Sequence, residues 1–399
     1  MEGIYQKVPS EEIVKRVSAF QVELKKHNFD GAIILQNIDQ YYFTGTMQNA
    51  LLFIPSEGES TLFVKKSLER AKVETPCNVI PMPSMKELSD KILAMGYSVE
   101  NIGLELDVLP YSQFQRIKKA FSSSSFGDIA AIIRQLRSVK SEYEIEMIKK
   151  AADVAYEAIE EVPNILKENM TEIEFVAELE KFVRIKGHLG SLRLRAFNQE
   201  LFLGMVVSGE SASAPAAFDG PAGGQGLSPA MPQGAGWKVI QRNDPILIDI
   251  AVSINGYVVD QTRMGVIGEL DQELEEAYQV AVKIIKEIEL RAKPGTLWSE
   301  HYLYSLKLAE EAGLKDYFMG FKEDQAKFLG HGVGLEIDEF PVLAKGLDYP
   351  LQEGMVIAIE PKFTFPNKGV VGIENTYVVR KDGLESISYA QEDILKIKK

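Results

Sequence analysis

The chain has 399 residues, with 45% hydrophobic and 26% charged side chains, and its 44 basic and 58 acidic residues give a formal net charge of −14. This is the composition of a globular protein, and it excludes a disordered, collagenous or disulfide-stapled chain. The excess of negative charge disfavours nonspecific binding to nucleic acid or to anionic membranes, so we expect neither as a partner.

Cys77 is the only cysteine, which rules out an internal disulfide and a cysteine-based zinc site. Residues 1–16 carry several charges and no apolar core, so they do not resemble a signal peptide. No apolar run approaches the roughly 20 residues that a membrane-spanning helix needs. We therefore expect a cytoplasmic protein, and the chain length suggests two or three domains.

The first 135 residues predict an α/β domain. Apolar side chains at mostly helical spacing predict a helix over residues 11–26. Short apolar runs bounded by turn residues follow at 32–35, 42–45, 50–54 and 61–64. Residues 122–128 are rich in Ser, with Gly and Asp at their end, and predict a loop near the domain boundary.

Three helices with recognisable start signals are predicted in the rest of the chain. Two begin with a capping box, in which a Ser or Thr and a Glu three residues later bond each other's backbone N–H. These pairs are Ser141 with Glu144 and Thr171 with Glu174. The third helix begins at Asp271 and ends at the Pro-Gly pair of residues 294–295.

Residues 208–236 are dominated by Gly, Ala, Pro and Ser and carry almost no charge. A surface loop is the plainer interpretation, but a long segment of this kind inside a compact domain is often functional. Its glycines do not form a phosphate-binding motif, because no Lys-Ser or Lys-Thr follows them.

Residues 245–263 carry the most informative pattern. The Asn-Gly pair at 255–256, between two β-rich runs, is the strongest local signal for a hairpin. With this pair in the turn, Thr262 lies opposite Asp249, and Asp260 shares their face. The two aspartates are then diagonal neighbours roughly 7–8 Å apart, close enough to share a cation. An exposed strand face with two unrelated acids explains the pattern equally well.

Three further residues with metal-binding side chains follow. His331 lies among the glycines of residues 330–334, Glu360 ends an apolar strand, and Glu374 lies inside another. Each alone has an ordinary explanation, but five such residues in apolar or glycine-rich strand contexts argue against coincidence. Carboxylates with one imidazole suit divalent ions such as Mn²⁺, Co²⁺, Fe²⁺ or Zn²⁺, and four carboxylates carry enough charge for two ions.

These motifs resemble those of the pita-bread metallohydrolases, the family of prolidase, aminopeptidase P, methionine aminopeptidase and creatinase. The matching segments are Asp249 to Asp260-Gln-Thr-Arg, Gly-His-Gly-Val-Gly at 330–334, Glu360-Pro361 and Ile-Glu-Asn-Thr at 373–376. Residues 29–34 and 42–45 resemble the creatinase-type N-terminal domain. The resemblance implies an α/β (α+β) fold with a creatinase-like domain at 1–135 and a pita-bread catalytic domain at 138–399.

The resemblance also implies a role for each candidate ligand. Asp260 and Glu374 would bridge two divalent ions, Asp249 would bind one of them, and His331 with Glu360 would bind the other. Glu360 would also act in catalysis by helping to deprotonate a water that bridges the metals. The implied ions are Mn, Co or Zn, and relatives with this N-terminal domain imply a homodimer.

The chain departs from the family at three positions near the expected site. Ala216 and Asp338 stand where peptidases of the family usually carry histidines, and Gly372 stands where an arginine is usual. A histidine can donate a proton to a leaving group, whereas alanine cannot and an ionised aspartate only accepts. The residues that would activate water are therefore retained, and those that would stabilise the substrate are replaced. Asp338, at one of the replaced positions, is itself a candidate catalytic residue.

Candidate replacements lie in a polar cluster at 188–198, formed by His188, Arg193, Arg195 and Asn198. We predict that Arg193 or Arg195 binds a substrate carboxylate or stabilises an oxyanion, and a surface or dimer salt bridge is the alternative. The loop at 208–236 lies where the first histidine is lost, so we expect it to form a lid or a pocket wall.

Three functions are consistent with these features. The first is a metal-dependent hydrolase resembling Xaa-Pro dipeptidase or aminopeptidase P, which cleaves the C–N bond of a small peptide with a metal-bridging hydroxide. The replaced histidines favour a second, hydrolysis of a nonpeptide C–N bond in a small amide, as in creatinase or ectoine hydrolase. The third is a catalytically silent binding protein, and the retained ligands argue against it because buried acids without a cation are costly.

Overall fold

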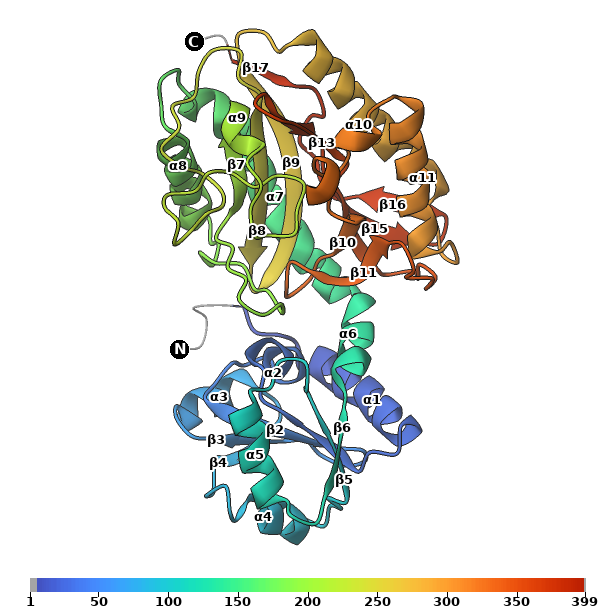
Figure 1. Cartoon of the computed structure of the whole chain (residues 1–399). Coiled ribbons are helices and arrows are strands. Elements are labelled where there is room, and N and C mark those ends of the chain that lie inside the picture. The colour runs from blue at the N-terminus through green and yellow to red at the C-terminus, as the bar shows by residue number, and fades with distance from the viewer. Residues whose placement is uncertain (1–5, 398–399) are drawn as a thin grey trace. The chain divides into compact units, whose positions relative to one another are not determined.

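The computed structural model describes residues 6–397. The chain divides into two compact units, Met1–Arg137 and Ser138–Lys399, and most of their elements are labelled in Figure 1. Within residues 6–397, no helix is long and apolar enough to cross a membrane.

The first unit is built on one six-stranded sheet with the order β4-β3-β2-β1-β5-β6. β1 pairs antiparallel with β2 and parallel with β5, so the sheet is mixed. The strands are β1 (Gly31–Ile34), β2 (Ala50–Pro55), β3 (Thr61–Val64), β4 (Asn78–Pro81), β5 (Asn101–Leu104) and β6 (Ser125–Asp128). The helices are α1 (Ser10–Lys26), α2 (Asn37–Thr44), α3 (Leu68–Glu74), α4 (Leu88–Ala94), α5 (Tyr111–Ala120) and α6 (Ala130–Ser138).

Two sequence predictions in this unit need comment. The loop predicted at residues 122–128 is wrong for its last four residues, which form the strand β6 at the edge of the sheet beside β5. An edge strand needs only backbone pairing on one side, so polar side chains do not prevent it. The apolar run at 42–45 is the end of helix α2, which Gly45 closes in the left-handed conformation at φ 73°.

The second unit contains a four-stranded sheet (β17-β9-β8-β7), a five-stranded sheet (β11-β10-β12-β15-β16) and the ribbon β13-β14. Its strands are β7 (Gly204–Ser208), β8 (Ile246–Ile254), β9 (Tyr257–Ile267), β10 (Phe328–Gly332), β11 (Glu339–Ala344), β12 (Val356–Ile359), β13 (Lys362–Phe365), β14 (Gly369–Gly372), β15 (Asn375–Arg380), β16 (Gly383–Ser386) and β17 (Leu395–Ile397). Its helices are α7 (Glu142–Ile165), α8 (Glu172–Ile185), α9 (Gly209–Ala212), α10 (Gln272–Arg291) and α11 (Trp298–Glu311), with 3₁₀ turns η1 (Lys315–Tyr317) and η2 (Lys322–Asp324).

The predicted helix starts are confirmed. Both capping boxes are present, at the N-termini of α7 and α8. The Asp271 side chain accepts a hydrogen bond from the Glu273 backbone N–H at the start of α10. These caps satisfy backbone donors that the first turn of a helix leaves without an intrahelical partner.

The hairpin predicted from the Asn-Gly pair is also confirmed. Asn255 and Gly256 have φ values of 51° and 91°, as a two-residue turn between twisted strands requires. The register places Thr262 opposite Asp249 and pairs Asp260 with Ala251. Because the register is the predicted one, both aspartates project from the same face of β8 and β9.

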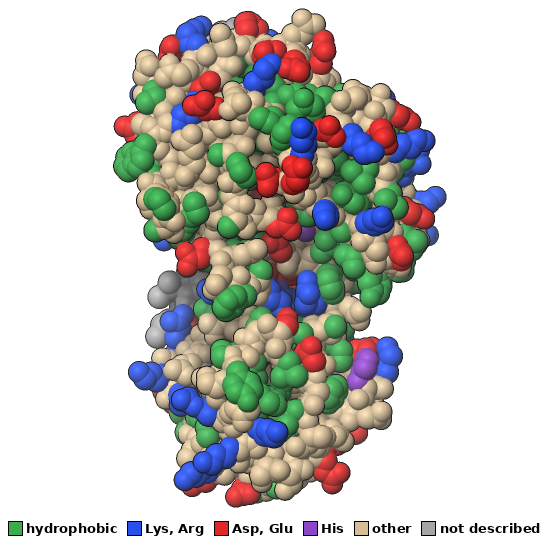
Figure 2. Space-filling model, in the orientation of Figure 1, with side chains coloured by type: hydrophobic (Ala, Val, Ile, Leu, Met, Phe, Trp, Pro, Cys, Tyr) green, Lys and Arg blue, Asp and Glu red, His purple; other side chains and the backbone are tan. Residues whose placement is uncertain are grey.

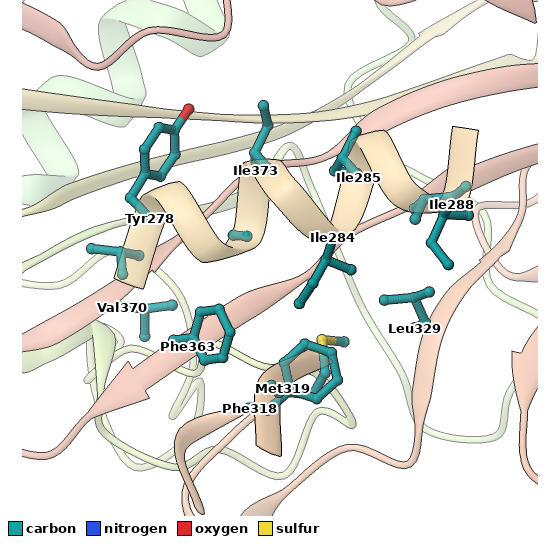
Figure 3. Packing of buried hydrophobic residues seen from close by; sticks show 14 of the residues in the cluster. Tyr278, Ile284, Ile285, Ile288, Phe318, Met319, Leu329, Phe363, Val370 and Ile373 are labelled. Atoms are coloured by element: carbon teal, nitrogen blue, oxygen red, sulfur yellow. The ribbon is translucent and has the colours of Figure 1, made fainter. Parts of the chain in front are cut away.

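The core of the second unit forms around α10. Figure 3 shows this helix above the β13-β14 ribbon, with Ile284 pointing toward Phe318 and Met319. Phe363 of β13 and Val370 of β14 belong to the same buried cluster. This packing holds the ribbon in place. Because β13 begins just after Glu360 and β14 ends just before Glu374, it also positions both predicted glutamate ligands.

We expect substitution of Ile284 by Ala to lower the free energy of unfolding by about 2–5 kcal/mol, because it leaves a cavity in a fully buried cluster. Leu290→Ala on the same helix is the matched control, since Leu290 is 83% exposed and should change stability by no more than about 0.5 kcal/mol. Urea unfolding of both variants measures the difference. Equal losses would show that this cluster does not stabilise the unit.

Candidate metal centre

The five predicted ligands lie together in the second unit. Asp249 and Asp260 come from β8 and β9, His331 from β10, Glu360 follows β12, and Glu374 precedes β15. All five line one cavity of about 50 Å³. In Figure 2, acidic side chains and a histidine are visible in a hollow of this unit.

The two larger sheets meet at this point. Backbone bridges join Thr262 of β9 to Glu374 in both directions, with N···O distances of 3.3 Å. β12 lies between β10 and β15, so Glu360 is held beside both His331 and Glu374. Residues far apart in the chain therefore share one site because strand pairing brings them together.

The His331 ring is oriented with one nitrogen toward the acids. Its Nδ1 lies 2.8 Å from the carbonyl oxygen of Ile337, and because a carbonyl only accepts, Nδ1 carries the proton. In the neutral ring, the form that binds a metal, Nε2 then has a free lone pair, and it lies 3.6 Å from Glu360 Oε1 and 3.8 Å from Asp260 Oδ2. A histidine that donates its other N–H to a carbonyl in this way is oriented as a metal ligand usually is.

The Thr-Arg pair of the motif positions Glu374. Thr262 Oγ1 donates to Glu374 Oε2 at 2.8 Å. The Arg263 guanidinium, fully buried, donates to the Glu374 carbonyl at 2.9 Å and to Asn375 Oδ1 at 2.8 Å. Glu374 Oε1 has no hydrogen-bond partner within the described part of the chain, and such a buried acceptor costs about 1–3 kcal/mol unless a cation binds it.

Sequence reasoning missed one residue of this site, Lys362. Its Nζ donates to Glu360 Oε2 at 2.6 Å, to Asp249 Oδ2 at 2.9 Å and to Glu374 Oε2 at 3.1 Å. An ammonium has three N–H donors, so all of them are used by carboxylates. The available signal was the spacing of two residues from Glu360, which in an extended chain places both side chains on one face.

Gly372 provides the space for this lysine. It pairs with Lys362 across the β13-β14 ribbon. A Cβ atom at position 372 would lie 2.5 Å from Lys362 Cγ and 2.6 Å from the Pro361 carbonyl oxygen. At the position where the family usually has an arginine, a side chain would therefore clash both with the lysine stem and with the backbone.

Burial and mutual repulsion affect the acids of the site. Burial raises the pKa of Asp260 well above its usual range, and the neighbouring Glu374 and Asp249 carboxylates raise it further. Burial also raises the pKa of Asp249, although the Lys362 ammonium opposes this change. Repulsion of this kind indicates that the lysine alone does not balance the negative charge.

The same charges favour the protonated form of the basic groups. Burial disfavours the His331 imidazolium, but Asp338, Glu360 and Asp260 outweigh burial and raise the pKa of His331 to about 9. The pKa of Lys362 is raised well above its usual range for the same reason, despite complete burial. The site thus attracts positive charge strongly.

The donor set fits one divalent ion. Within residues 6–397, one group of three or more His, Cys, Asp and Glu side chains has ligand atoms within 4.8 Å of one another, and it consists of Asp260, His331 and Glu374. Glu374, whose Oε1 is orphaned, belongs to this group. Beside this group, Lys362 holds one oxygen each of Asp249, Glu360 and Glu374.

Of the other candidate residues, Asp338 lines the cavity, and Arg193, Arg195 and His188 are not among the described residues that line it. Asp338 is half-buried, with Oδ1 3.5 Å from His331 Nδ1. The Arg193 carbonyl nevertheless accepts a hydrogen bond from the backbone N–H of Ile337, a lining residue, at 3.0 Å. His188 is buried away from the cavity, where its Nδ1 accepts from Ser253 N at 3.0 Å.

The small-residue loop contributes a wall, as the sequence predicts. Residues 218–222 line the same cavity, and Ala216 lines a neighbouring one of about 270 Å³. Both ends of the loop are tied to the Glu172 carboxylate, which accepts hydrogen bonds from Ser208 N at 2.7 Å, Ser211 Oγ at 3.0 Å and Gly236 N at 3.0 Å. One buried acid thus anchors a loop that has little regular structure.

The fold and the donor set define a metal-dependent hydrolase. The chain belongs to metallopeptidase family M24, whose sequence pattern matches residues 146–381, and residues 16–139 match the creatinase/prolidase N-terminal domain. The family and the fold class predicted from the motifs are therefore confirmed.

Similar proteins extend over nearly the whole chain. An Xaa-Pro dipeptidase of Pyrococcus furiosus is 29% identical over 375 residues, covering 93% of this chain and 97% of its own. An uncharacterized peptidase of Staphylococcus saprophyticus is 30% identical, covering 92% and 97%. The crystal structure of the prolidase from Pyrococcus horikoshii OT3 superposes with a TM-score of 0.80 at 27% identity, covering 95% of this chain and 99% of that chain.

We expect Glu172→Gln to loosen the loop, because the amide nitrogen cannot accept the bonds that one carboxylate oxygen accepts now. Hydrogen bonds to a charged group contribute about 1.5–3 kcal/mol each, so limited proteolysis should cut within residues 213–235 at least several-fold faster. Glu178→Gln, on the exposed side of the same helix, is the control. Unchanged cleavage in the Glu172 variant would mean that the loop is held by other contacts.

Proposed function

We propose that this chain hydrolyses the C–N bond of small peptides, with Xaa-Pro peptides as the substrate class. The observation that carries the proposal is the group Asp260, His331 and Glu374, with a buried carboxylate oxygen that lacks any partner in the described chain. Relatives named Xaa-Pro dipeptidase and prolidase, similar over almost the full length, support the substrate class.

The residues present divide the chemistry among them. A divalent ion held by Asp260, His331 and Glu374 would supply Lewis acidity for water and for a carbonyl oxygen. Glu360 is suited to accept the proton of the attacking water at Oε1, because Lys362 holds its other oxygen at 2.6 Å. The lysine thereby fixes the orientation of the general base.

The cavity beside these groups has an apolar side. Leu201, Met205 and Ile337 belong to a buried cluster, Phe218 packs against it, and all four line the cavity. An apolar wall next to polar catalytic groups suits a substrate with an apolar side chain or a prolyl ring. The relatives do not favour a nonpeptide amide as the substrate. Because Ala216 and Asp338 replace histidines that are usual in the peptidases, the test nevertheless includes nonpeptide amides.

Several further predictions from the sequence belong to this proposal. They are a cytoplasmic location, a homodimer and manganese, cobalt or zinc as the native metal. Metal analysis of the purified protein and sedimentation of the full chain would test the metal and the homodimer.

A substrate panel tests the proposed function. The full chain, loaded in turn with Mn²⁺, Co²⁺ and Zn²⁺, is assayed against Xaa-Pro dipeptides, longer Xaa-Pro peptides, matched Xaa-Ala peptides and small nonpeptide amides. We expect cleavage of Xaa-Pro peptides that EDTA abolishes. Turnover of the nonpeptide amides alone, or of none of the panel, would contradict the proposal.

We expect Asp260→Ala and Glu374→Ala each to abolish metal binding and hydrolysis, because each removes a charged ligand from a group of three. Titration calorimetry with Mn²⁺ measures binding, and the peptide assay measures hydrolysis. Glu353→Ala is the control, since Glu353 is an exposed acid ahead of β12. Full activity in either ligand variant would refute the assignment of ligands.

Arg193→Ala or Arg195→Ala should raise KM about tenfold or more if one guanidinium binds the substrate carboxylate, since a charged hydrogen bond contributes about 1.5–3 kcal/mol. Arg242→Ala, at an exposed position with an ion pair to Glu168, is the control. Steady-state kinetics with a dipeptide and its C-terminal amide separate a carboxylate contact from a general effect. Unchanged KM and kcat in both variants would exclude this role.

A further inference from the structure

We infer that the Lys362 ammonium is a built-in cation that takes the place of one of the two expected metal ions, so that the chain binds a single divalent ion on the His331 side of the site. The inference concerns the same site as the proposed function, but it predicts a metal stoichiometry and does not depend on any activity.

The first argument is the position of the nitrogen. Nζ lies 2.6–3.1 Å from one oxygen each of Glu360, Asp249 and Glu374, and the side chain is 1% exposed. Divalent ions bind such oxygens at about 2.0–2.6 Å. An ion bound to the same three oxygens would therefore overlap with the ammonium, so the two cations cannot occupy this position together.

The second argument is the division of the carboxylate oxygens. Glu360 and Glu374 each give one oxygen, Oε2, to Lys362. Their other oxygens face elsewhere: Glu360 Oε1 lies 3.6 Å from His331 Nε2, and Glu374 Oε1 has no partner among the described residues. The two glutamates thus present one oxygen to the lysine and keep one for a second cation.

The third argument is the adaptation of the surrounding strand. Lys362 is the first residue of β13, and its stem lies over Gly372 of β14, where any Cβ would be 2.5 Å from Lys362 Cγ. The Pro361 carbonyl oxygen, 2.6 Å from the same Cβ position, excludes a side chain there as well. The absence of a side chain at position 372 leaves the path of the lysine stem to the carboxylates clear.

The fourth argument is charge. Three buried carboxylates and the half-buried Asp249 repel one another unless cations offset them, and a buried acid without a cation or a proton is costly. One ammonium offsets one of the four charges, and a divalent ion at His331 would offset two more. An ammonium beside two divalent ions would instead leave the site with excess positive charge.

Metal stoichiometry tests the inference. The full chain is stripped with EDTA, equilibrated with Mn²⁺, desalted and measured by plasma mass spectrometry and by EPR. We expect one Mn²⁺ per chain and the six-line spectrum of an isolated ion. Lys362→Gly should bind two Mn²⁺ per chain and show the spectrum of an exchange-coupled pair, because the position among the three oxygens becomes free.

Lys368→Gly is the matched control, because Lys368 lies in the turn of the same ribbon and pairs with the exposed acids Asp271 and Glu273. It should bind one Mn²⁺ per chain. Two ions in the wild-type chain, or one ion in the Lys362 variant, would overturn the inference, as would a wild-type chain that binds none. The wild-type spectrum decides the matter even where the glycine variant does not fold. One bound ion without any peptide cleavage would leave this inference standing and remove the proposed function.

Discussion

The site is governed by the electrostatic cost of holding four carboxylates together inside a protein. Asp249, Asp260, Glu360 and Glu374 line one small cavity, and like charges at such distances are tolerated only with cations or protons among them. The surrounding residues hold these acids in position. Thr262 donates to one carboxylate oxygen of Glu374, Arg263 donates to its backbone carbonyl, and the Lys362 ammonium donates to three of the acids. The apolar packing of α10 against the β13-β14 ribbon keeps these groups in place.

Much of this arrangement could be predicted from the sequence, because the signals are local. The register of β8 and β9 follows from the Asn-Gly turn alone, since the side-chain period of a strand then places Asp249 and Asp260 on one face. The capping boxes of α7 and α8 are equally local and are present as predicted. The family follows from motifs that are specific in type and spacing.

What could not be predicted depends on contacts between distant strands. The spacing of Lys362 from Glu360 places both side chains on one face, but the other two acids that the lysine reaches come from β8 and from the residue before β15, which the local sequence does not specify. The absence of arginine at Gly372 was visible in the sequence, but the contacts that exclude a side chain there, the lysine stem and the Pro361 carbonyl oxygen, are seen only in the folded ribbon. The strand β6 was missed for a related reason, since edge pairing leaves no apolar pattern to detect.

The pairing of Lys362 with Gly372 has a consequence for how this chain can vary. A larger residue at position 372 would push the lysine away from the carboxylates, and a shorter residue at position 362 would leave the glycine facing an empty space. Removing the lysine alone does not make room for a side chain at 372, because the Pro361 carbonyl oxygen and Lys362 Cα lie 2.6 and 2.7 Å from where its Cβ would be. A change to arginine at 372 therefore requires a shift of the ribbon backbone as well as loss of the lysine, and this double requirement keeps the two forms of the site separate.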